Sequence, residues 1–274
     1  MIKPKKIPYV AIILIVFSFI PLLPLIMVIL TSFKPEKEIL SFSTLFPQNW
    51  TLHNFTFILS NKEEIPIFRW LFNSIFVAIA TTFFVLFINS LAAFALARLK
   101  LPFKKVAFTM IIATLMIPGV VTFVPLYLVL NYLKWIDSYK ALIIPGGASA
   151  FGVFLLYQFF KGIPRDYDES AMIDGASKIR IYFSIILPMS KPVLSTLGIF
   201  TFMGSWNSFL YPLIVIDSND LYTLPVGLAL FQGTYTEEYG LAFALSLMSS
   251  IPIIIIFLIF QKAIIKGMAL TGIK

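Results

Sequence analysis

The sequence contains no cysteine and a single histidine, His53, in 274 residues. Without cysteine the chain can form neither a disulfide framework nor a thiolate metal site, and one histidine is too few for a zinc or haem site. It also lacks the GxxxxGK[ST] phosphate loop, so it has no Walker-type site for ATP hydrolysis. We therefore expect no metal, no cofactor and no catalytic residue in this chain.

Charged residues are also scarce, at 12% of the chain against about 25% in soluble domains, whereas 59% of the residues are hydrophobic. The apolar residues form six runs of about 20 residues or more, each long enough to cross a bilayer core of about 30 Å. This predicts an all-α polytopic membrane protein with six transmembrane helices. We place the spans at about 9–30, 70–97, 106–130, 141–160, 193–216 and 241–260, within a transmembrane domain of residues 9–265.

The first apolar run follows Lys3, Lys5 and Lys6, as the apolar core of a signal peptide follows its basic start. However, the run is longer than the usual 7–15 residues, and no small-residue cleavage site follows it. We therefore interpret it as a retained span.

The distribution of charge predicts the orientation. If the N-terminus, 1–8, is cytoplasmic, fifteen of the 21 Lys and Arg residues fall on the cytoplasmic side, as the positive-inside rule requires. The C-terminal tail, 266–274, is then cytoplasmic too. Topology thus accounts for the net charge of +8, and we expect no nucleic-acid partner, because the basic residues flank apolar runs.

None of the six predicted spans carries a charged residue in its interior. A charge at the bilayer centre costs about 2.5–3.5 kcal/mol on insertion scales, so carriers that use a carboxylate relay keep it for function. The missing relay argues against the alternative of a proton-coupled secondary carrier. Because the chain also lacks a phosphate loop, energy for transport has to arrive through contact with another protein.

Acidic residues on the cytoplasmic side are confined to the segment 163–192. Pro164 and Asp166 precede a stretch that favours a two-turn helix over 167–174, with Asp166 as its N-cap and Glu169 at the capping-box position. Gly175 suits the left-handed residue that ends such a helix. A helix this short needs a docking partner for stability, although a capped surface helix between two spans is the simpler alternative.

The same segment resembles the cytoplasmic signature of ABC importer permeases. Glu169, Ser170 and Ala171, then Gly175, then Ile185, Leu187 and Pro188 keep every spacing of Glu-Ala-Ala-x₃-Gly-x₉-Ile-x-Leu-Pro, with Ser170 as the one departure. The resemblance implies a type I importer permease fold, and a coupling helix that sits in a cleft of an ATPase subunit. Its implied ATPase-coupling residues are Tyr167, Asp168, Glu169, Ala171, Asp174, Gly175 and Pro188. Glu169 would pair with a basic group, Ala171 would allow close packing and Gly175 would permit the turn.

Further stretches, among them LTSFKP (30–35), GSWNSFLYPL (204–213) and YTLPVGLALF (222–231), resemble the smaller permease of maltose-type bacterial sugar importers. This resemblance implies a multi-pass subunit of a bacterial or archaeal cytoplasmic membrane that contacts lipid and passes a sugar. Its implied partners are a homologous second permease, two ATPase subunits that bind ATP and Mg, and an extracytoplasmic solute-binding protein. Related permeases carry other polar solutes such as glycerol phosphate, which remains an alternative.

Two groups of polar and aromatic residues are candidates for contact outside the coupling segment. Those in the spans are candidates for the substrate path, although each could instead bridge helices or anchor the span at the membrane interface: Asn89, Tyr127, Trp206, Asn207 and Tyr211. In maltose-type permeases the external loop corresponding to 217–240 reaches the binding protein. The candidates there are Tyr222, Gln232, Tyr235 and Glu237, although any solvated connector could carry such residues.

Overall fold

The computed structural model describes residues 14, 17, 19–41, 44–235 and 237–271. Every regular element in this part of the chain is a helix, which confirms the predicted all-α class. The helices form two compact units, one of residues up to Ile67 plus Gly227–Ile255, and one of Phe68–Val226 plus residues from Ile256 onward. The predicted N-terminal segment, 1–8, and the start of the first predicted span, 9–30, lie outside the described residues, apart from Leu14 and Phe17.

The first unit is built from η1 (Ile20–Leu22), α2 (Leu23–Ser32), α3 (Glu36–Ser41), α4 (His53–Ser60), most of α15 (Leu224–Thr234) and the first half of α16 (Tyr239–Thr271). Asn54 of α4 joins two of these elements, because its amide donates to the carbonyls of Ser32 and Lys34 at 2.9 and 3.0 Å. Gly240 at the start of α16 packs on the same side chain, and a Cβ at Gly240 would lie 2.8 Å from Asn54 Nδ2. The glycine therefore permits this close approach.

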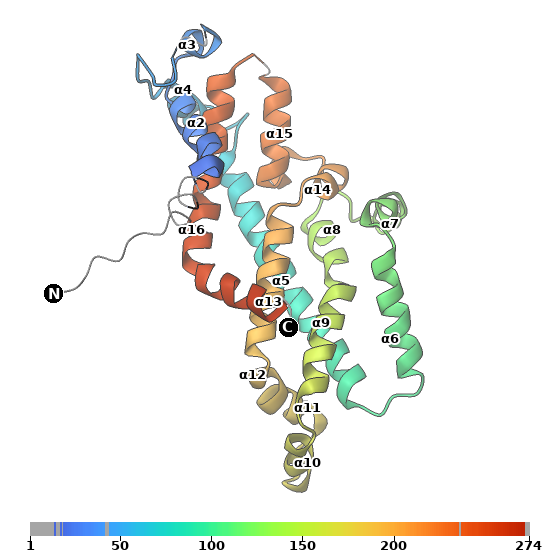
Figure 1. Ribbon diagram of the computed structural model, residues 1–274. Coiled ribbons are helices and arrows are strands. Elements are labelled where there is room, and N and C mark those ends of the chain that lie inside the picture. Colours follow the sequence, from blue (N-terminus) through green and yellow to red (C-terminus); the bar gives the residue numbers. More distant parts are fainter. Residues whose placement is uncertain (1–13, 15–16, 18, 42–43, 236, 272–274) are drawn as a thin grey trace, which may run out of the picture. The chain divides into compact units, whose positions relative to one another are not determined.

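The second unit begins with α5 (Ile67–Arg98), whose 32 residues form one uninterrupted apolar helix. Its remaining helices follow in chain order (Figure 1): α6 (Lys104–Ala113), η2 (Thr114–Met116), η3 (Gly119–Thr122), α7 (Phe123–Tyr132), α8 (Tyr139–Ile143), η4 (Pro145–Gly147), α9 (Ala150–Gly162), α10 (Asp166–Ile173), α11 (Lys178–Ile181), the π-helical turn η5 (Tyr182–Ile186), α12 (Leu187–Met189), α13 (Lys191–Trp206), α14 (Leu210–Val215) and η6 (Asn219–Leu221).

Two stretches of the described chain, Ile67–Arg98 and 139–162, are apolar helices long enough to cross a membrane. They contain the second and fourth predicted spans. The third predicted span, 106–130, is broken, because Lys104–Met116 and Gly119–Tyr132 meet at 100°. Pro118 explains the break, since it has no N–H to donate and forces Ile117 into an extended conformation with φ −89° and ψ 117°.

The fifth predicted span, 193–216, also differs from a single helix. The helix α13 ends at Trp206, and the chain resumes helical geometry only at Leu210. Pro212 accounts for the interruption, because it cannot donate to the carbonyl of Ser208 and its ring would clash with that carbonyl in a continuous helix. The sixth predicted span, 241–260, falls within α16, which continues through the start of the predicted tail to Thr271.

One hydrophobic cluster in the second unit joins α5, α9, α13 and the segment 163–192. Its buried members are Val85, Ala93, Phe94, Ala97, Leu156, Phe160, Ile163, Ile181, Tyr182, Ile186, Val193 and Leu197. Within it, the hydroxyl groups of Ser90 on α5 and Tyr182 in η5 lie 2.7 Å apart and share a hydrogen bond. Because close-packed interiors transmit displacement, movement of the segment 163–192 would reach all three long helices.

Candidate functional site

The helix α10 lies at the end of α9 that is away from α8 (Figure 1). Its C-terminus is a complete Schellman motif. The N–H of Ala176 donates to the carbonyl of Ala171 at 2.8 Å, and the N–H of Gly175 donates to the carbonyl of Met172 at 3.1 Å. Gly175 has φ +76°, the left-handed conformation predicted for it. No atom lies within 4 Å of where its Cβ would be, so conformation and not space requires glycine there.

The N-terminus of α10 differs from the prediction. The helix covers Asp166–Ile173, one residue earlier than predicted, and its N-cap is Arg165 and not Asp166. The carbonyl of Arg165 already accepts the N–H groups of Asp168 and Glu169, at 2.9 and 3.0 Å. No side chain caps this end, so Asp166 and Glu169 act only as first-turn acids that favour the positive end of the helix dipole.

A buried guanidinium attaches α10 to the helices beside it. Arg98, the last residue of α5, is 8% exposed and donates to the carbonyls of Phe160 and Ile163 at 2.6 and 2.7 Å. Its other terminal nitrogen lies 3.3 Å from Asp168 Oδ2, in an ion pair with α10. One side chain thus joins the C-terminal ends of α5 and α9 to α10, and we call these contacts the Arg98 clamp.

The clamp changes the interpretation of Asp168. The resemblance implies a surface role for this residue in ATPase coupling, but it is only 8% exposed and its carboxylate faces Arg98 inside the chain. Asp168 is therefore a positioning residue. Its neighbour Glu169 is exposed, as are Asp174 and Pro188, whereas Ala171 is half-buried and packs against the hydrophobic cluster described above.

The outer face of α10 carries apolar as well as acidic groups. The side chain of Tyr167 is 49% exposed and that of Ile173 is 87% exposed. The exposed side chains of Tyr167, Glu169 and Ile173 are the groups of α10 available to a partner.

The return from α10 to α13 is held by a cap and a bend. Ser177 caps α11 by accepting the N–H of Arg180 at 3.2 Å. The helical run 178–189 then meets α13 at 78°, at the fully buried Ser190, whose hydroxyl donates to Ile186 at 2.6 Å. Pro192 in the first turn of α13 cannot donate to Pro188, which explains the bend.

The candidate path residues fall into two groups. Asn89 is 1% exposed and donates to Val85 and to Gly147, at 2.7 and 3.1 Å, while Trp206 is 5% exposed and stacks on Phe202. Both side chains are therefore packing residues in this structure and are not positioned to meet a solute.

The other path candidates are more open. Tyr127 and Asn207 are exposed, and Tyr211 is half-buried with its hydroxyl donating to Ala141 at 2.6 Å. The ring of Tyr211 lies 5.9 Å from that of Phe123 on α7, the helix that also carries Tyr127. These three residues remain candidates for the substrate path.

A network of hydrogen bonds holds the segment 217–224 to α5 and to the turn before α8. Asn73 donates to the carbonyls of Asp220 and Tyr222, both at 2.8 Å, and accepts from the hydroxyl of Tyr139 at 2.6 Å. Asp137 accepts the N–H groups of Asp217 and Ser218 and the Ser218 hydroxyl. Burial raises the pKa of Asp137, but these hydrogen bonds outweigh it and leave the pKa lowered. Tyr222 thus occupies a fixed position.

The other candidates for binding-protein contact lie in the first unit. Gln232 and Glu237 are exposed, while Tyr235 is half-buried and donates its hydroxyl to Glu64 at 2.7 Å. This hydrogen bond is the main reason that the pKa of Tyr235 is raised. The described residues include no group of three or more His, Asp or Glu that could hold a metal ion.

Sequence reasoning missed Arg98 as part of the site. A basic residue that directly follows an apolar run is counted as a topology signal, and nothing local distinguishes it from Lys100 or Lys104. The distinguishing facts are the burial of Arg98 and its contacts 62 to 70 residues away, which only the folded chain supplies.

Residues 88–270 match the family described as the binding-protein-dependent transport system inner membrane component. Two similar proteins are 34% identical to this chain. The arabinooligosaccharides transport system permease of Bacillus subtilis aligns over 94% of this chain and 92% of its own length, and the trehalose/maltose transport system permease of Thermococcus litoralis over 95% and 94%. The sulfoquinovosyl glycerol transport system permease of Agrobacterium fabrum is 35% identical, and the alignment covers 92% of this chain and 89% of that protein.

Among solved structures, a chain of a bacterial ABC transporter involved in the import of the acidic polysaccharide alginate is similar in fold. The TM-score is 0.80 at 22% sequence identity, and the match covers 92% of this chain and 94% of that one. This similarity agrees with the type I permease fold expected from the signature spacing.

Proposed function

This chain belongs to the binding-protein-dependent transport system inner membrane components, and we propose that it is a permease subunit that forms half of the path for a sugar or oligosaccharide. Three of its relatives are named for the transport of arabinooligosaccharides, trehalose/maltose and diacetylchitobiose. These names favour a sugar over the alternative of glycerol phosphate. The observation that carries the proposal is the coupling helix, which keeps the signature spacing and projects an acidic and apolar face.

In the proposed mechanism, α10 docks on an ATPase subunit through Glu169, Tyr167 and Ile173. Closure of the ATPase dimer would displace α10, and the Arg98 clamp would pass that displacement to α5 and α9. The packed cluster shared with α13 supports the same route, because a close-packed core moves as a body. The chain itself would hydrolyse nothing.

The complete importer would contain a homologous second permease, two ATPase subunits and an external solute-binding protein. The exposed Gln232 and Glu237 are proposed to contact that binding protein, and the hydrogen-bonded segment 217–224 would hold Tyr222 ready for the same contact. Both termini are proposed to be cytoplasmic because of the positive-inside distribution.

The energy source gives the first test. Purified alone in lipid vesicles, the chain should neither hydrolyse ATP nor take up maltotriose or arabinotriose, because it has no phosphate loop. With its partners reconstituted, one of these sugars should stimulate ATP hydrolysis and enter the vesicles. Uptake by the isolated chain, driven by a proton gradient, would contradict the proposal and favour a secondary carrier.

The orientation gives a second test, and the cysteine-free sequence makes it direct. Single cysteines at Ser60 and Ser218, both exposed, should react with an impermeant thiol reagent in intact cells. A cysteine at Ser177, exposed in the coupling segment, should react only after the membrane is opened. Labelling of Ser177→Cys in intact cells would reverse the assigned topology.

A further inference from the structure

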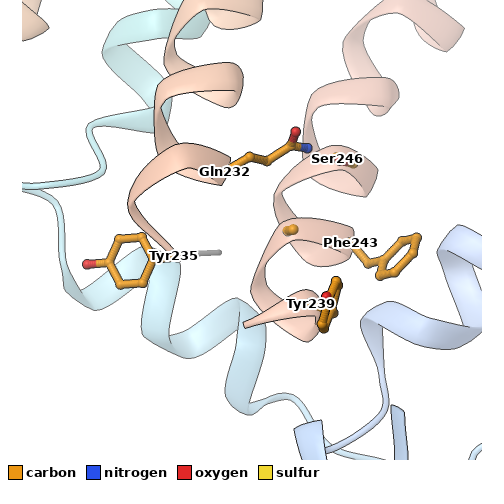
Figure 2. Close-up of a pocket in the computed structure, with 6 residues that line it drawn as sticks. Gln232, Tyr235, Tyr239, Phe243 and Ser246 are labelled. Carbon is orange, nitrogen blue, oxygen red and sulfur yellow. The ribbon is translucent and has the colours of Figure 1, made fainter. Parts of the chain in front are cut away.

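A hollow of about 340 Å³ lies in the first unit, between the end of α15 and the first turns of α16 (Figure 2). This volume falls at the lower end of the range of about 300–1,000 Å³ that is typical of small-molecule sites. Four of the lining residues are spaced i, i+3, i+4 and i+7 and so share one face of α16. The lining consists of Gln232, Tyr235, Tyr239, Ala242, Phe243 and Ser246.

The lining combines three aromatic rings, two of them tyrosines, with the amide of Gln232 and the aliphatic hydroxyl of Ser246. Figure 2 shows Gln232 extending from α15 toward α16 near Ser246, while the Tyr235 ring is directed away from α16, the Phe243 ring is directed away from α15, and Tyr239 lies below them in the view. Within the part of the chain that the structure describes, neither the Gln232 amide nor the Ser246 hydroxyl has a hydrogen-bond partner. Both groups are therefore available to a ligand.

The walls of the hollow are fixed by contacts behind them. The Glu36 carboxylate accepts the N–H groups of Tyr239 and Gly240 at 3.1 and 2.8 Å and so holds the start of α16. The ring of Tyr235 stacks on Phe231 with centroids 4.6 Å apart, and its hydroxyl donates to Glu64. A site whose walls are already ordered loses less entropy when a ligand binds.

We propose that this hollow is a subsite for one ring of an uncharged sugar. The positive-inside distribution of Lys and Arg places the hollow on the external side of the membrane. The inference rests on the proposed function and narrows its substrate class. The C–H faces of a sugar ring suit the faces of Tyr239 and Phe243, and its hydroxyl groups suit the Gln232 amide and the Ser246 hydroxyl.

The charges around the hollow argue against an anionic solute. Among the described residues, the charged groups bonded to its lining are the carboxylates of Glu36 and Glu64. A phosphate or uronate would meet no cation in the lining. The hollow therefore selects neutral sugars over glycerol phosphate.

The test measures ligand binding to the complete importer in lipid nanodiscs without the solute-binding protein. Saturation-transfer NMR would follow maltotriose and arabinotriose as neutral probes and glycerol 3-phosphate as the anionic probe. We expect at least one neutral probe to bind more tightly than the phosphate. Tyr239→Ala and Gln232→Ala should each weaken that binding by about five- to tenfold, the loss of one ligand contact.

Two control variants sharpen the result. Tyr239→Phe keeps the ring and should bind the neutral probe as the unaltered importer does. Thr234→Ala removes an exposed hydroxyl of α15 that does not line the hollow, so binding should again be unchanged.

Three results would overturn the subsite: no binding of either neutral sugar, equal binding by Tyr239→Ala and the unaltered importer, or tighter binding of glycerol 3-phosphate. Sugar uptake by the complete importer with its binding protein is measured separately. If uptake proceeds while the subsite fails these tests, the proposed function stands without the subsite. Loss of ATP-dependent sugar uptake would instead contradict the proposed function.

Discussion

Replacing Glu169 by Ala is expected to abolish solute uptake and solute-stimulated ATP hydrolysis, while the variant inserts and accumulates normally. Glu169 is exposed in the first turn of α10, so its loss within this chain costs no more than about 1 kcal/mol. At a docked interface, removing one member of a desolvated charge pair costs about 2–5 kcal/mol, which weakens docking by about 30-fold or more. Uptake and ATPase assays on the reconstituted importer measure the difference.

Gly175→Val is expected to have an effect of the same size for a different reason. The residue has φ +76°, a conformation that costs an ordinary L-residue about 1–2 kcal/mol and a β-branched residue more. Since nothing lies within 4 Å of its Cβ position, the damage comes from the turn and not from a clash. The Val variant should also lose the ATPase subunits during purification, because the end of α10 is displaced.

Matched variants distinguish docking from general damage. Ser170→Ala changes an exposed neighbour of Glu169 and should leave uptake unchanged. Gly175→Asn should recover much of the uptake, because asparagine tolerates the left-handed conformation better than other residues with a side chain. Near-normal uptake by both Glu169→Ala and Gly175→Val would reduce α10 to a solvated connector and remove the assignment of coupling.

Arg98→Ala is also expected to have a large effect, through a different contact. It leaves the Asp168 carboxylate buried without its counter-charge, and the carbonyls of Phe160 and Ile163 lose their donor. Breaking a buried ion pair by removing one partner costs about 3–5 kcal/mol, and the lower value suits this pair because the Asp168 side chain is 12% exposed. We expect amide hydrogen exchange in α10 to speed up by about a hundredfold and uptake to fall at least tenfold.

Additional variants show which contact of the clamp matters. Lys100→Ala, an exposed residue two positions further on, should leave exchange and uptake unchanged. Replacing Arg98 and Asp168 together by Met removes the unpaired charge but still leaves two carbonyls without a donor, so uptake should stay low. Full uptake in the double variant would mean that the ion pair is dispensable and that packing alone holds α10.

How far the sequence predicts this protein depends on whether a property is local. The helical class follows from apolar runs about 20 residues long, which have to satisfy their own backbone hydrogen bonds in a membrane. The end of α10 at Gly175 follows from one residue type and its left-handed conformation. The family follows from the spacing of Glu169, Gly175 and Pro188, and the match of residues 88–270 to that family confirms it.

Helix boundaries at prolines were less predictable. The apolar run 106–130 is continuous in composition, yet it breaks by 100° where Pro118 removes a donor and extends Ile117. The run 193–216 likewise ends its first helix at Trp206, ahead of Pro212. Hydropathy measures the preference of side chains for lipid and is insensitive to a single missing backbone hydrogen bond.

By itself, the sequence determined the helical class, the family and the position of the short helix α10, because these depend on composition, spacing and single-residue conformation. Only the tertiary structure decided which charges are internal and which are exposed. Asp168 and Glu169 are adjacent acids in the same turn, but one points to Arg98 and the other to solvent. The same holds for Asn89, whose side-chain amide is buried and donates to the carbonyl of Gly147, 58 residues away. Burial depends on contacts between distant segments, which local sequence does not encode.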